Sequence, residues 1–212
     1  NGVSQLNKLI LTHLDQDHRG GYESIKHDFP IKKVYSNEQV DVENLSQFDY
    51  CRQGQQWHWS DRVNITVLSP KHEHLAKAKF EKNEMSCVVY LQVKNVQPYQ
   101  NFLLMGDAGW ETEYHILQAY PDLKVDVLVL GHHGSRHSSA YHFLKQLKPK
   151  LTVASAGWNN RYGHPSVIVE SRLEDLNIPL LTTIEHGSIR FFKQKNIMSI
   201  AFQRDSQRWL KH

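Results

Sequence analysis

The sequence has few cysteines, little net charge and no long apolar run, and each absence excludes a class of protein. Two cysteines in 212 residues cannot build a disulfide scaffold. No segment approaches the roughly 18 consecutive apolar residues of a membrane span, and the first residues lack the basic and apolar regions of a secretory signal. With 40% hydrophobic residues and a formal net charge of +3, disorder is not expected either. This small positive charge permits nucleic acid as a partner without indicating it.

Histidine, by contrast, is abundant, with 14 in 212 residues. Neutral imidazole is a common metal ligand, and it also serves as an acid or a base near neutral pH. The length predicts one domain over residues 1–212, because domains usually run to roughly 100–200 residues. The positions of the histidines therefore bear directly on what this domain does.

Hydrophobic patterning predicts short strands that alternate with short helices. The strands are expected at 9–11, 33–35, 63–68, 87–93, 102–105, 125–130, 151–154, 180–184, 189–192 and 198–202. The helices are expected at 22–27, at 111–119, from Ser139 as N-cap to 147, and from Pro165 in the first turn to 176. Residues 37–56 and 71–83 are expected to form loops. Strands covered by helices indicate a layered α/β protein.

Acidic and histidine side chains gather directly after the first predicted strand, in the segment THLDQDH. Residues two apart share a face of an extended chain, so His13, Asp15 and Asp17 can point together. His18 can reach the same space where the chain turns into a helix. Carboxylates this close repel one another unless a cation lies between them. The pattern favours a divalent metal site, and the alternative is a solvated turn with incidental charges.

Two further predicted strands end in metal-ligating residues. Asp107 follows the apolar run LLMG, and His132 and His133 follow the run VLVLG. In open α/β sheets, sites form outside the carboxyl ends of the strands. A single Asp in this position is usually a cap, and a single His-His-Gly is usually a loop, but the three strand ends together indicate one metal centre.

On these motifs the chain resembles a metallo-β-lactamase superfamily domain, and more narrowly the C-terminal hydrolase-like domain of ComEC-type DNA-uptake channel proteins of bacteria. The matching stretches, in the family's order, are LILTHLDQDHRGG, NEMSCVVYL, LLMGDAGWETE, DVLVLGHHGSRHSS, SAGWNNRYGHP and TTIEHGSIRFF. The resemblance implies an αββα sandwich. It also implies further strands before the first matching stretch, so that the chain would be an N-terminally truncated form of the domain.

Two departures from the superfamily pattern concern the metal ligands. Asp15 stands where the superfamily motif H-x-H-x-D-H has its second histidine, as is typical of the ComEC-type branch. Residues 83–86, Asn-Glu-Met-Ser, contain no histidine where the superfamily usually supplies one. One metal site would therefore have fewer protein ligands than the other, and a β-lactamase is not expected.

The resemblance assigns the metal ligands position by position. His133 is preferred to His132 because the family's ligand directly precedes a glycine, and His132 would then hold the substrate or act as an acid. Carboxylate-rich ligation suits Mn²⁺ as well as Zn²⁺, so one or two such ions are expected. One ion would be held by Asp17, His18 and His133 and the other by His13 and Asp15, with Asp107 bridging the two.

Other side chains beside these motifs are candidates for catalysis and substrate binding. With Asp17 and His132, His164 is a catalytic candidate, because it could donate a proton to the leaving oxygen; the alternative is a structural residue at the start of a helix. The hydroxyl groups could bind phosphate or cap a helix, and the arginines could contact phosphates or simply lie at the surface. These substrate-binding candidates are Ser135, Arg136, Ser138 and Arg161.

The resemblance implies a metal-dependent phosphodiesterase, most specifically a nuclease that acts on single- or double-stranded DNA during natural transformation. The alternatives are a module that binds DNA or docks to the channel without cleaving, and a phosphodiesterase for small or cell-wall phosphoesters. The resemblance further implies a full-length protein of the bacterial inner membrane, whose transmembrane channel domain carries this soluble domain on the periplasmic side. A sheet edge left uncovered by absent strands predicts a dimer.

The cysteines and one tryptophan pair leave alternatives open. Cys87 lies in an apolar strand and is expected in the core, whereas Cys51 lies in the loop-like region. A disulfide between them would require an oxidising compartment. Trp57 and Trp59 alternate around one residue and indicate one face of a strand, used for packing or for base stacking.

Overall fold

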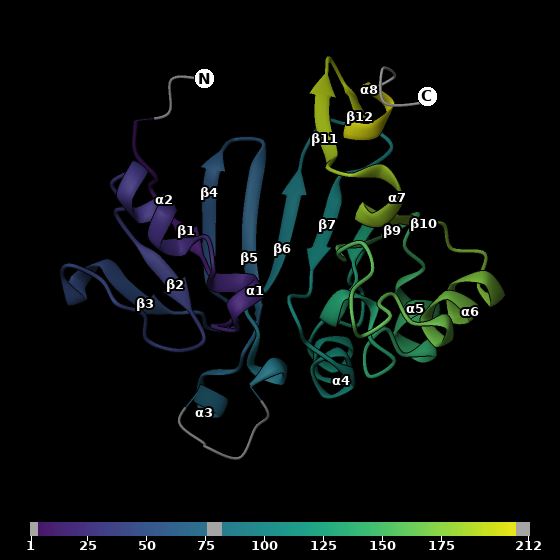
Figure 1. Cartoon of the computed structure of the whole chain (residues 1–212), viewed down its shortest axis with the longest axis horizontal. Helices are drawn as coiled ribbons and strands as arrows, with labels where there is room; N and C mark the ends of the chain where they lie inside the picture. The colour runs from purple at the N-terminus through teal and green to yellow at the C-terminus, as the bar shows by residue number, and fades with distance from the viewer. Residues whose placement is uncertain (1–3, 76–81, 207–212) are drawn as a thin grey trace.

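The computed structural model describes residues 4–75 and 82–206, which form three sheets with helices against them (Figure 1). The strands are β1 (Leu9–Ile10), β2 (Val34–Ser36), β3 (Phe48–Tyr50), β4 (Gln56–Ser60), β5 (Val63–Ser69), β6 (Val88–Val93), β7 (Asn101–Leu104), β8 (Val127–Val129), β9 (Leu151–Ala154), β10 (Leu180–Thr182), β11 (Ile189–Gln194) and β12 (Ile197–Phe202). The helices are α1 (Gln16–Arg19), α2 (Tyr22–Asp28), α3 (His72–Leu75), α4 (Trp110–Ala119), α5 (Tyr141–Leu147), α6 (Val167–Asp175), α7 (Thr183–His186) and α8 (Gln203–Ser206), with 3-10 turns η1 (Leu45–Gln47), η2 (Asn83–Met85) and η3 (Gly131–Gly134).

The central sheet has seven strands in the order β10-β9-β8-β7-β6-β5-β4. Strands β7 to β10 run parallel to one another, and β4 to β7 are joined in antiparallel pairs. A second sheet of β1, β2 and β3 is parallel throughout, and β11 and β12 form an antiparallel hairpin. Because β7, β8 and β9 are parallel neighbours, the segments that follow them emerge at the same edge of the sheet, where sites in α/β proteins form.

Two apolar clusters hold the layers together on opposite faces of the central sheet. On one face α4, α5 and α6 pack against the sheet through residues such as Ile116, Phe143 and Leu173, which are almost fully buried. On the other face the β11–β12 hairpin packs against β7, β8 and β9, with Met198 in this cluster. Burial of this apolar surface, at about 25 cal/mol per Å², is the main stabilising term of such a fold.

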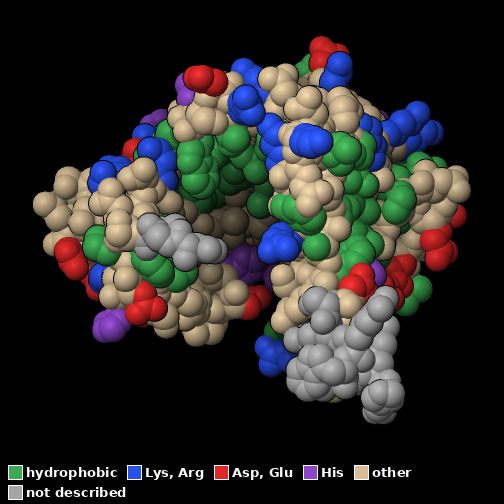
Figure 2. All heavy atoms as spheres, turned by 90° about the horizontal axis from the view of Figure 1, so that it is seen from above, with side chains coloured by type: hydrophobic (Ala, Val, Ile, Leu, Met, Phe, Trp, Pro, Cys, Tyr) green, Lys and Arg blue, Asp and Glu red, His purple; other side chains and the backbone are tan. Residues whose placement is uncertain are grey.

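The space-filling view shows a hollow between the part of the molecule that carries β1 to β3 and the part that carries the β11–β12 hairpin (Figure 2). Hydrophobic side chains line its walls, and lysines and arginines lie around its rim. Among the described residues, no helix is both long and apolar enough to cross a membrane.

Most predicted elements are present, with differences at their ends. Residues 37–56, predicted as a loop, contain β3, which forms by pairing with β2. The N-cap of α5 is Ala140 rather than Ser139, whose φ of 54° is left-handed. Pro165 precedes α6 instead of lying in its first turn, and the Ser166 side chain caps that helix by accepting from the Val169 N–H. The predicted loop at 71–83 falls partly outside the described residues.

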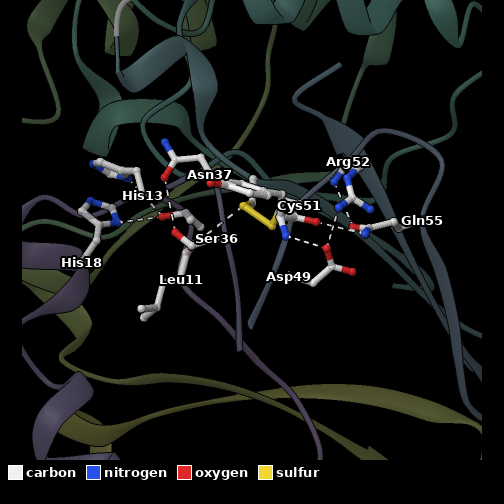
Figure 3. Close-up of a disulfide and its surroundings, with 12 residues drawn as sticks. Leu11, His13, His18, Ser36, Asn37, Asp49, Cys51, Arg52 and Gln55 are labelled. Carbon is white, nitrogen blue, oxygen red and sulfur yellow. Dashed lines mark hydrogen bonds and ion pairs between the residues drawn. A yellow bond between two sulfur atoms is a disulfide. The ribbon is translucent and has the colours of Figure 1, made fainter. Parts of the chain in front are cut away.

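A disulfide joins Cys51 to Cys87, and both residues are fully buried (Figure 3). It connects the end of β3 to the start of β6, across 36 positions of sequence. Cys51 N–H donates to the Ser36 carbonyl, and Cys87 N–H donates to the Thr12 carbonyl at 2.8 Å. The disulfide therefore fastens the small parallel sheet to the central sheet, directly beside the segment that begins with Thr12.

Candidate metal centre

The candidate site is built where four chain segments meet: the segment after β1, the segment after β7, the η3 turn after β8, and the loop after β9. The first segment carries His13, Asp15, Asp17 and His18, and the second carries Asp107. His13 is 1% exposed and Asp107 is 4% exposed. Burial of a histidine and a carboxylate together is costly unless they are paired or hold a cation.

The two oxygens of Asp107 face different histidines. Oδ1 lies 3.0 Å from His18 Nε2 and 3.6 Å from His133 Nε2. Oδ2 lies 3.7 Å from His13 Nε2 and 3.8 Å from His132 Nε2. Asp107 thus lies between two sets of imidazole nitrogens, which is the position that a bridging carboxylate requires.

The first set of donor atoms surrounds His18. Its Nε2 lies 3.3 Å from His133 Nε2 and 3.7 Å from Asp17 Oδ2, and His133 Nε2 lies 3.1 Å from the same Asp17 oxygen. Ligands bound tetrahedrally at ~2.1 Å from one metal ion would lie about 3.4 Å apart. The observed separations match this value, so Asp17, His18 and His133 fit a divalent metal ion, and Asp107 approaches two of these ligands, His18 and His133.

The second set of donor atoms is smaller and centres on His13. His13 Nε2 is buried without a hydrogen-bond partner, and it lies 3.8 Å from Asp15 Oδ2 in addition to its contact with Asp107. An unpartnered buried nitrogen facing two carboxylates fits a cation between them. Within the described residues, groups of donor atoms lying within 4.8 Å of one another are formed by His13, His18 and Asp107 and by Asp17, His18 and His133.

Charge interactions in the cluster shift the pKa values of its members. Burial opposes ionisation of Asp107, but the hydrogen bond and positive charge of His18 outweigh it and lower the pKa of this carboxyl. Burial likewise opposes protonation of His18, but Asp107 and Asp17 outweigh it and raise the pKa of this imidazole. Burial, with the nearby charge of His18, lowers the pKa of His13. The pocket therefore favours positive charge beside Asp107 while keeping His13 neutral, the form in which histidine binds metal.

The backbone of η3 adopts an uncommon conformation to present its two histidines. His132 has φ 47° and ψ 47°, and His133 has φ 55° and ψ 18°. Left-handed backbone at residues other than glycine costs about 1–3 kcal/mol each and clusters at functional sites. Gly131 is required at the start of this turn, because a Cβ there would lie 2.2 Å from the Ala108 carbonyl oxygen.

Hydrogen bonds outside the cluster orient its ligands. The Thr12 hydroxyl lies 3.1 Å from His18 Nδ1 and 3.2 Å from His13 Nδ1. His133 Nδ1 contacts the Ser155 carbonyl at 2.7 Å, and the Ser86 hydroxyl accepts from the Asp107 N–H. Such outer contacts fix the imidazole tautomer and the ring orientation of metal ligands. None of these three partners appeared among the sequence candidates, since a hydroxyl or a main-chain carbonyl has no distinctive sequence signal.

The remaining predicted residues divide into two groups. His132 and His164 lie at the site, with ring centroids 5.7 Å apart, and His164 Nδ1 is buried without a partner. Burial, followed by the charge of His132, lowers the pKa of His164. From residues 83–86, Ser86 contacts Asp107 and Asn83 approaches His132, with the Asn83 side-chain nitrogen 3.5 Å from His132 Nδ1. An amide nitrogen is no metal ligand, which agrees with the smaller ligand set around His13.

Ser135 and Ser138 do not fit the predicted contact with phosphate. Both are buried, and the Ser138 hydroxyl donates to the carbonyls of Gly131 and Ser135, while the Ser135 hydroxyl accepts from the His137 N–H. They therefore stabilise the turn instead of facing solvent. Arg136 and Arg161 are exposed. Their side chains contact His137 and Tyr162 respectively.

Comparison with known proteins finds relatives over most of the chain, although no protein-family model matches it. The chain is 33% identical over 202 residues to ComE operon protein 3 of Bacillus subtilis, and 33% identical over 191 residues to competence protein ComA of Neisseria gonorrhoeae. It is 32% identical over 193 residues to Recombination protein 2 of Haemophilus influenzae. Each match covers 90% of this chain but only 25%, 26% and 23% of the respective relative. The chain thus spans about a quarter of the length of these relatives.

A solved structure from Parabacteroides distasonis, described as a metal-dependent hydrolase, has the same fold. The TM-score is 0.51 at 13% sequence identity, and the match covers 85% of this chain and 77% of the other. At this identity the likeness concerns the fold alone, and it confirms the predicted metallo-β-lactamase-like α/β class. The chain is therefore homologous, over 90% of its length, to about a quarter of each of these ComEC-type proteins.

Proposed function

We propose that this chain is a metal-dependent phosphodiesterase that cleaves DNA during bacterial DNA uptake. The observation that carries the proposal is the position of Asp107, whose two oxygens face two sets of histidine nitrogens. Bound divalent ions in such a site lower the pKa of water and neutralise charge that develops on a phosphoryl group. The relatives' names, which refer to competence and recombination, support DNA as the substrate.

The residues of the chain would hold and protonate the substrate beside the metal ligands. His164 lies next to His132 and His133, with centroid separations of 5.7 and 6.5 Å. Its lowered pKa leaves it mostly neutral near pH 7, and an incoming phosphate would favour its protonated form by opposite charge. His164 is then the proton donor to the leaving oxygen, and His132 contacts the phosphate.

Binding of the DNA backbone would rest on Arg136 and Arg161, which are exposed on the segments that carry His133 and His164. Lys145, Lys148 and Lys150 follow Arg136 in the sequence and could form either a basic strip with these arginines or a solvated helix face, and the position of Lys150 argues against a continuous strip. Lys150 pairs with Asp126, 2.7 Å away, just before β8 and hence at the opposite edge of the sheet from the site. Phosphate contacts release counterions, so log K for DNA should fall linearly with log salt.

The decisive experiment compares Asp17→Ala with the parent protein on DNA in the presence of Mn²⁺. Asp17 contacts His18 and His133 in the cluster, so its loss should abolish cleavage while leaving much of the DNA binding by the arginines. Asp61→Ala, a change at another exposed aspartate, serves as the matched control. Cleavage by Asp17→Ala at the parent rate would contradict the proposal.

The second candidate function is a module that binds DNA or docks to the channel without cleaving it. Asn83 favours this candidate, because it brings a nitrogen that cannot bind metal to the side of the site near His132. In that case parent and Asp17→Ala would bind DNA equally, and neither would cleave DNA at any Mn²⁺ concentration. Hydrolysis of small or cell-wall phosphodiesters in place of DNA would support the third candidate, a phosphodiesterase of that class.

Location and partners follow from the disulfide and from the length of the relatives. Disulfides persist mainly in oxidising compartments such as the bacterial periplasm, so the Cys51–Cys87 bond supports a periplasmic position. The relatives are about four times as long as the matched segment, which leaves room for an attached membrane channel.

The predicted dimer would use the edge strand β4, where Trp59 is 80% exposed. Light scattering of the parent protein and of the Trp59→Lys variant tests this dimer.

A further inference from the structure

A cavity of about 420 Å³ opens directly beside the metal cluster. Asp17 and His133 line it on the cluster side, and the loop after β9 together with Thr183 of α7 lines the rest. Cavities that bind small ligands usually measure roughly 300–1,000 Å³. A molecule in this cavity would therefore touch two of the candidate metal ligands, as a group attached to a metal-bound phosphate would.

One side of the cavity consists of small residues. Ser155, Ala156 and Gly157 lie there in succession. A Cβ added to Gly157 would meet no atom within 4 Å, so this position faces open space. A larger side chain at Gly157 would therefore add bulk to the lining of the cavity without displacing a neighbouring atom.

Nearly parallel rings also line the cavity. The Tyr162 and His164 rings are inclined by 19° with centroids 5.7 Å apart, and the His164 and His133 rings are inclined by 24° with centroids 6.5 Å apart. Tyr162 is 66% exposed, so much of this phenol is open to a ligand. The Arg161 guanidinium lies 4.6 Å from the Tyr162 ring centroid and adds a cation to the rim.

Hydrogen bonds hold both sides of the cavity in place. The Asn160 side chain accepts from the His164 N–H at 2.8 Å and donates to the His164 carbonyl at 2.7 Å. The Thr183 hydroxyl accepts from the Ala156 N–H at 2.9 Å and donates to the Ala156 carbonyl at 2.8 Å. A preorganised wall loses little conformational entropy when a ligand binds.

From this geometry we propose that the cavity binds the nucleoside attached to the scissile phosphate, with its base against the Tyr162–His164 wall and over Gly157. The proposal rests on the phosphodiesterase function and specifies its substrate class. An exposed tyrosine ring with a cation beside it, next to a phosphate site, suits a nucleobase, and base–aromatic stacking contributes about 1–3 kcal/mol per base with little sequence preference. These features of the cavity give no reason for a small aliphatic phosphodiester to bind more tightly than a nucleotide.

The test measures calorimetric binding of dTMP and of 2-deoxyribose 5-phosphate, which lacks the base, to the Mn²⁺-loaded protein. We expect dTMP to bind the parent about 10-fold more tightly, within the range that base stacking supplies. Tyr162→Ala and Gly157→Leu should bring dTMP to the level of deoxyribose phosphate while leaving Mn²⁺ affinity unchanged. Tyr162→Phe, which keeps the ring, should retain the preference.

Equal affinity of the parent for the two ligands would overturn the proposal, and so would a full dTMP preference in Gly157→Leu. Because that variant and Tyr162→Ala alter different lining residues of the cavity, failure of one to fold leaves the other as the test. A base preference without DNA cleavage would support the nucleoside site and count against the nuclease function. DNA cleavage without a base preference would support the nuclease function and count against the nucleoside site.

Discussion

His133 Nδ1 donates a hydrogen bond to the Ser155 main-chain oxygen, 2.7 Å away. A carbonyl oxygen can only accept, so the proton of the neutral imidazole is on Nδ1 and the lone pair is on Nε2. This Nε2 faces Asp17 and His18. His132 instead directs its Nδ1 toward the Asn83 side chain and lies farther from the carboxylates.

We therefore predict that His133→Ala removes the tighter metal site and that His132→Ala does not. The parent should retain one Mn²⁺ or Zn²⁺ after purification, held by Asp17, His18, Asp107 and His133, and a second should bind only when Mn²⁺ is added. Elemental analysis and calorimetric titration of the two variants measure this difference. Equal loss of the ion in both variants would contradict the assignment, and two tightly bound ions in the parent would show that the His13 site is stronger than expected.

Thr12→Val should weaken metal binding without unfolding the protein. The Thr12 hydroxyl contacts Nδ1 of both His13 and His18, and loss of such an outer partner typically costs about 10–100-fold in metal affinity. Valine keeps the shape of threonine, whereas Thr12→Ser keeps the hydroxyl and should bind metal like the parent. If both variants bind metal equally well, the hydroxyl does not orient these ligands.

Much of this site was predictable because its ligands follow apolar strands. Asp107 follows β7 and His133 follows β8, and parallel pairing of these strands brings the segments together at one edge. The THLDQDH segment was predictable for a second reason, because one short stretch of sequence supplies several of the ligands.

Other features depend on tertiary contacts that no local pattern encodes. Strand β3 has only three residues and forms by pairing with β2. The pairing of Cys51 with Cys87 depends on how β3 and β6 approach, and the role of Ser155 belongs to its main-chain oxygen. From the sequence, Ser138 was a candidate either for phosphate binding or for a helix cap. In the structure its hydroxyl donates to the Gly131 carbonyl, in the turn that carries the two histidines.

Replacing both cysteines, as Cys51→Ala with Cys87→Ala, should lower both stability and metal affinity. A disulfide that closes a loop of this length contributes about 2–4 kcal/mol to the free energy of unfolding. The Cys87 N–H also donates to the Thr12 carbonyl, and the neighbouring Ser86 hydroxyl accepts from the Asp107 N–H. Loosening this junction should therefore move two ligand segments apart. Urea unfolding and Mn²⁺ titration measure the two effects.

A control variant separates this local effect from general destabilisation. Met198→Ala removes a buried side chain from the cluster under the β11–β12 hairpin, and such a change costs about 2–5 kcal/mol. It should match the loss of stability while leaving metal affinity at the parent level. Equal metal affinity in the cysteine variant and the parent would mean that the disulfide only stabilises the fold.

The last prediction concerns Glu113, a fully enclosed carboxyl on α4 that supports the chain after η3. Its oxygens accept from the Ser139 and Ala140 N–H groups, and burial raises the pKa of Glu113 from 4.5 to about 7. Between these two values the folded protein binds more protons at this site than the unfolded chain does. Stability contributed by the protonated carboxyl is therefore present below pH 4.5 and is lost as the pH rises toward 7.

Glu113→Gln should remove this dependence, because glutamine does not ionise. From the stated pKa values the effect is ~3 kcal/mol between pH 4.5 and 7, at about 1.4 kcal/mol per pH unit. The test is urea unfolding of parent and variant at several pH values from 4.5 to 8. Histidines titrate in both proteins, so the quantity to follow is the difference between the two unfolding free energies, which should shift in favour of the variant as pH rises. A difference that stays constant with pH would show that folding does not raise the pKa of Glu113.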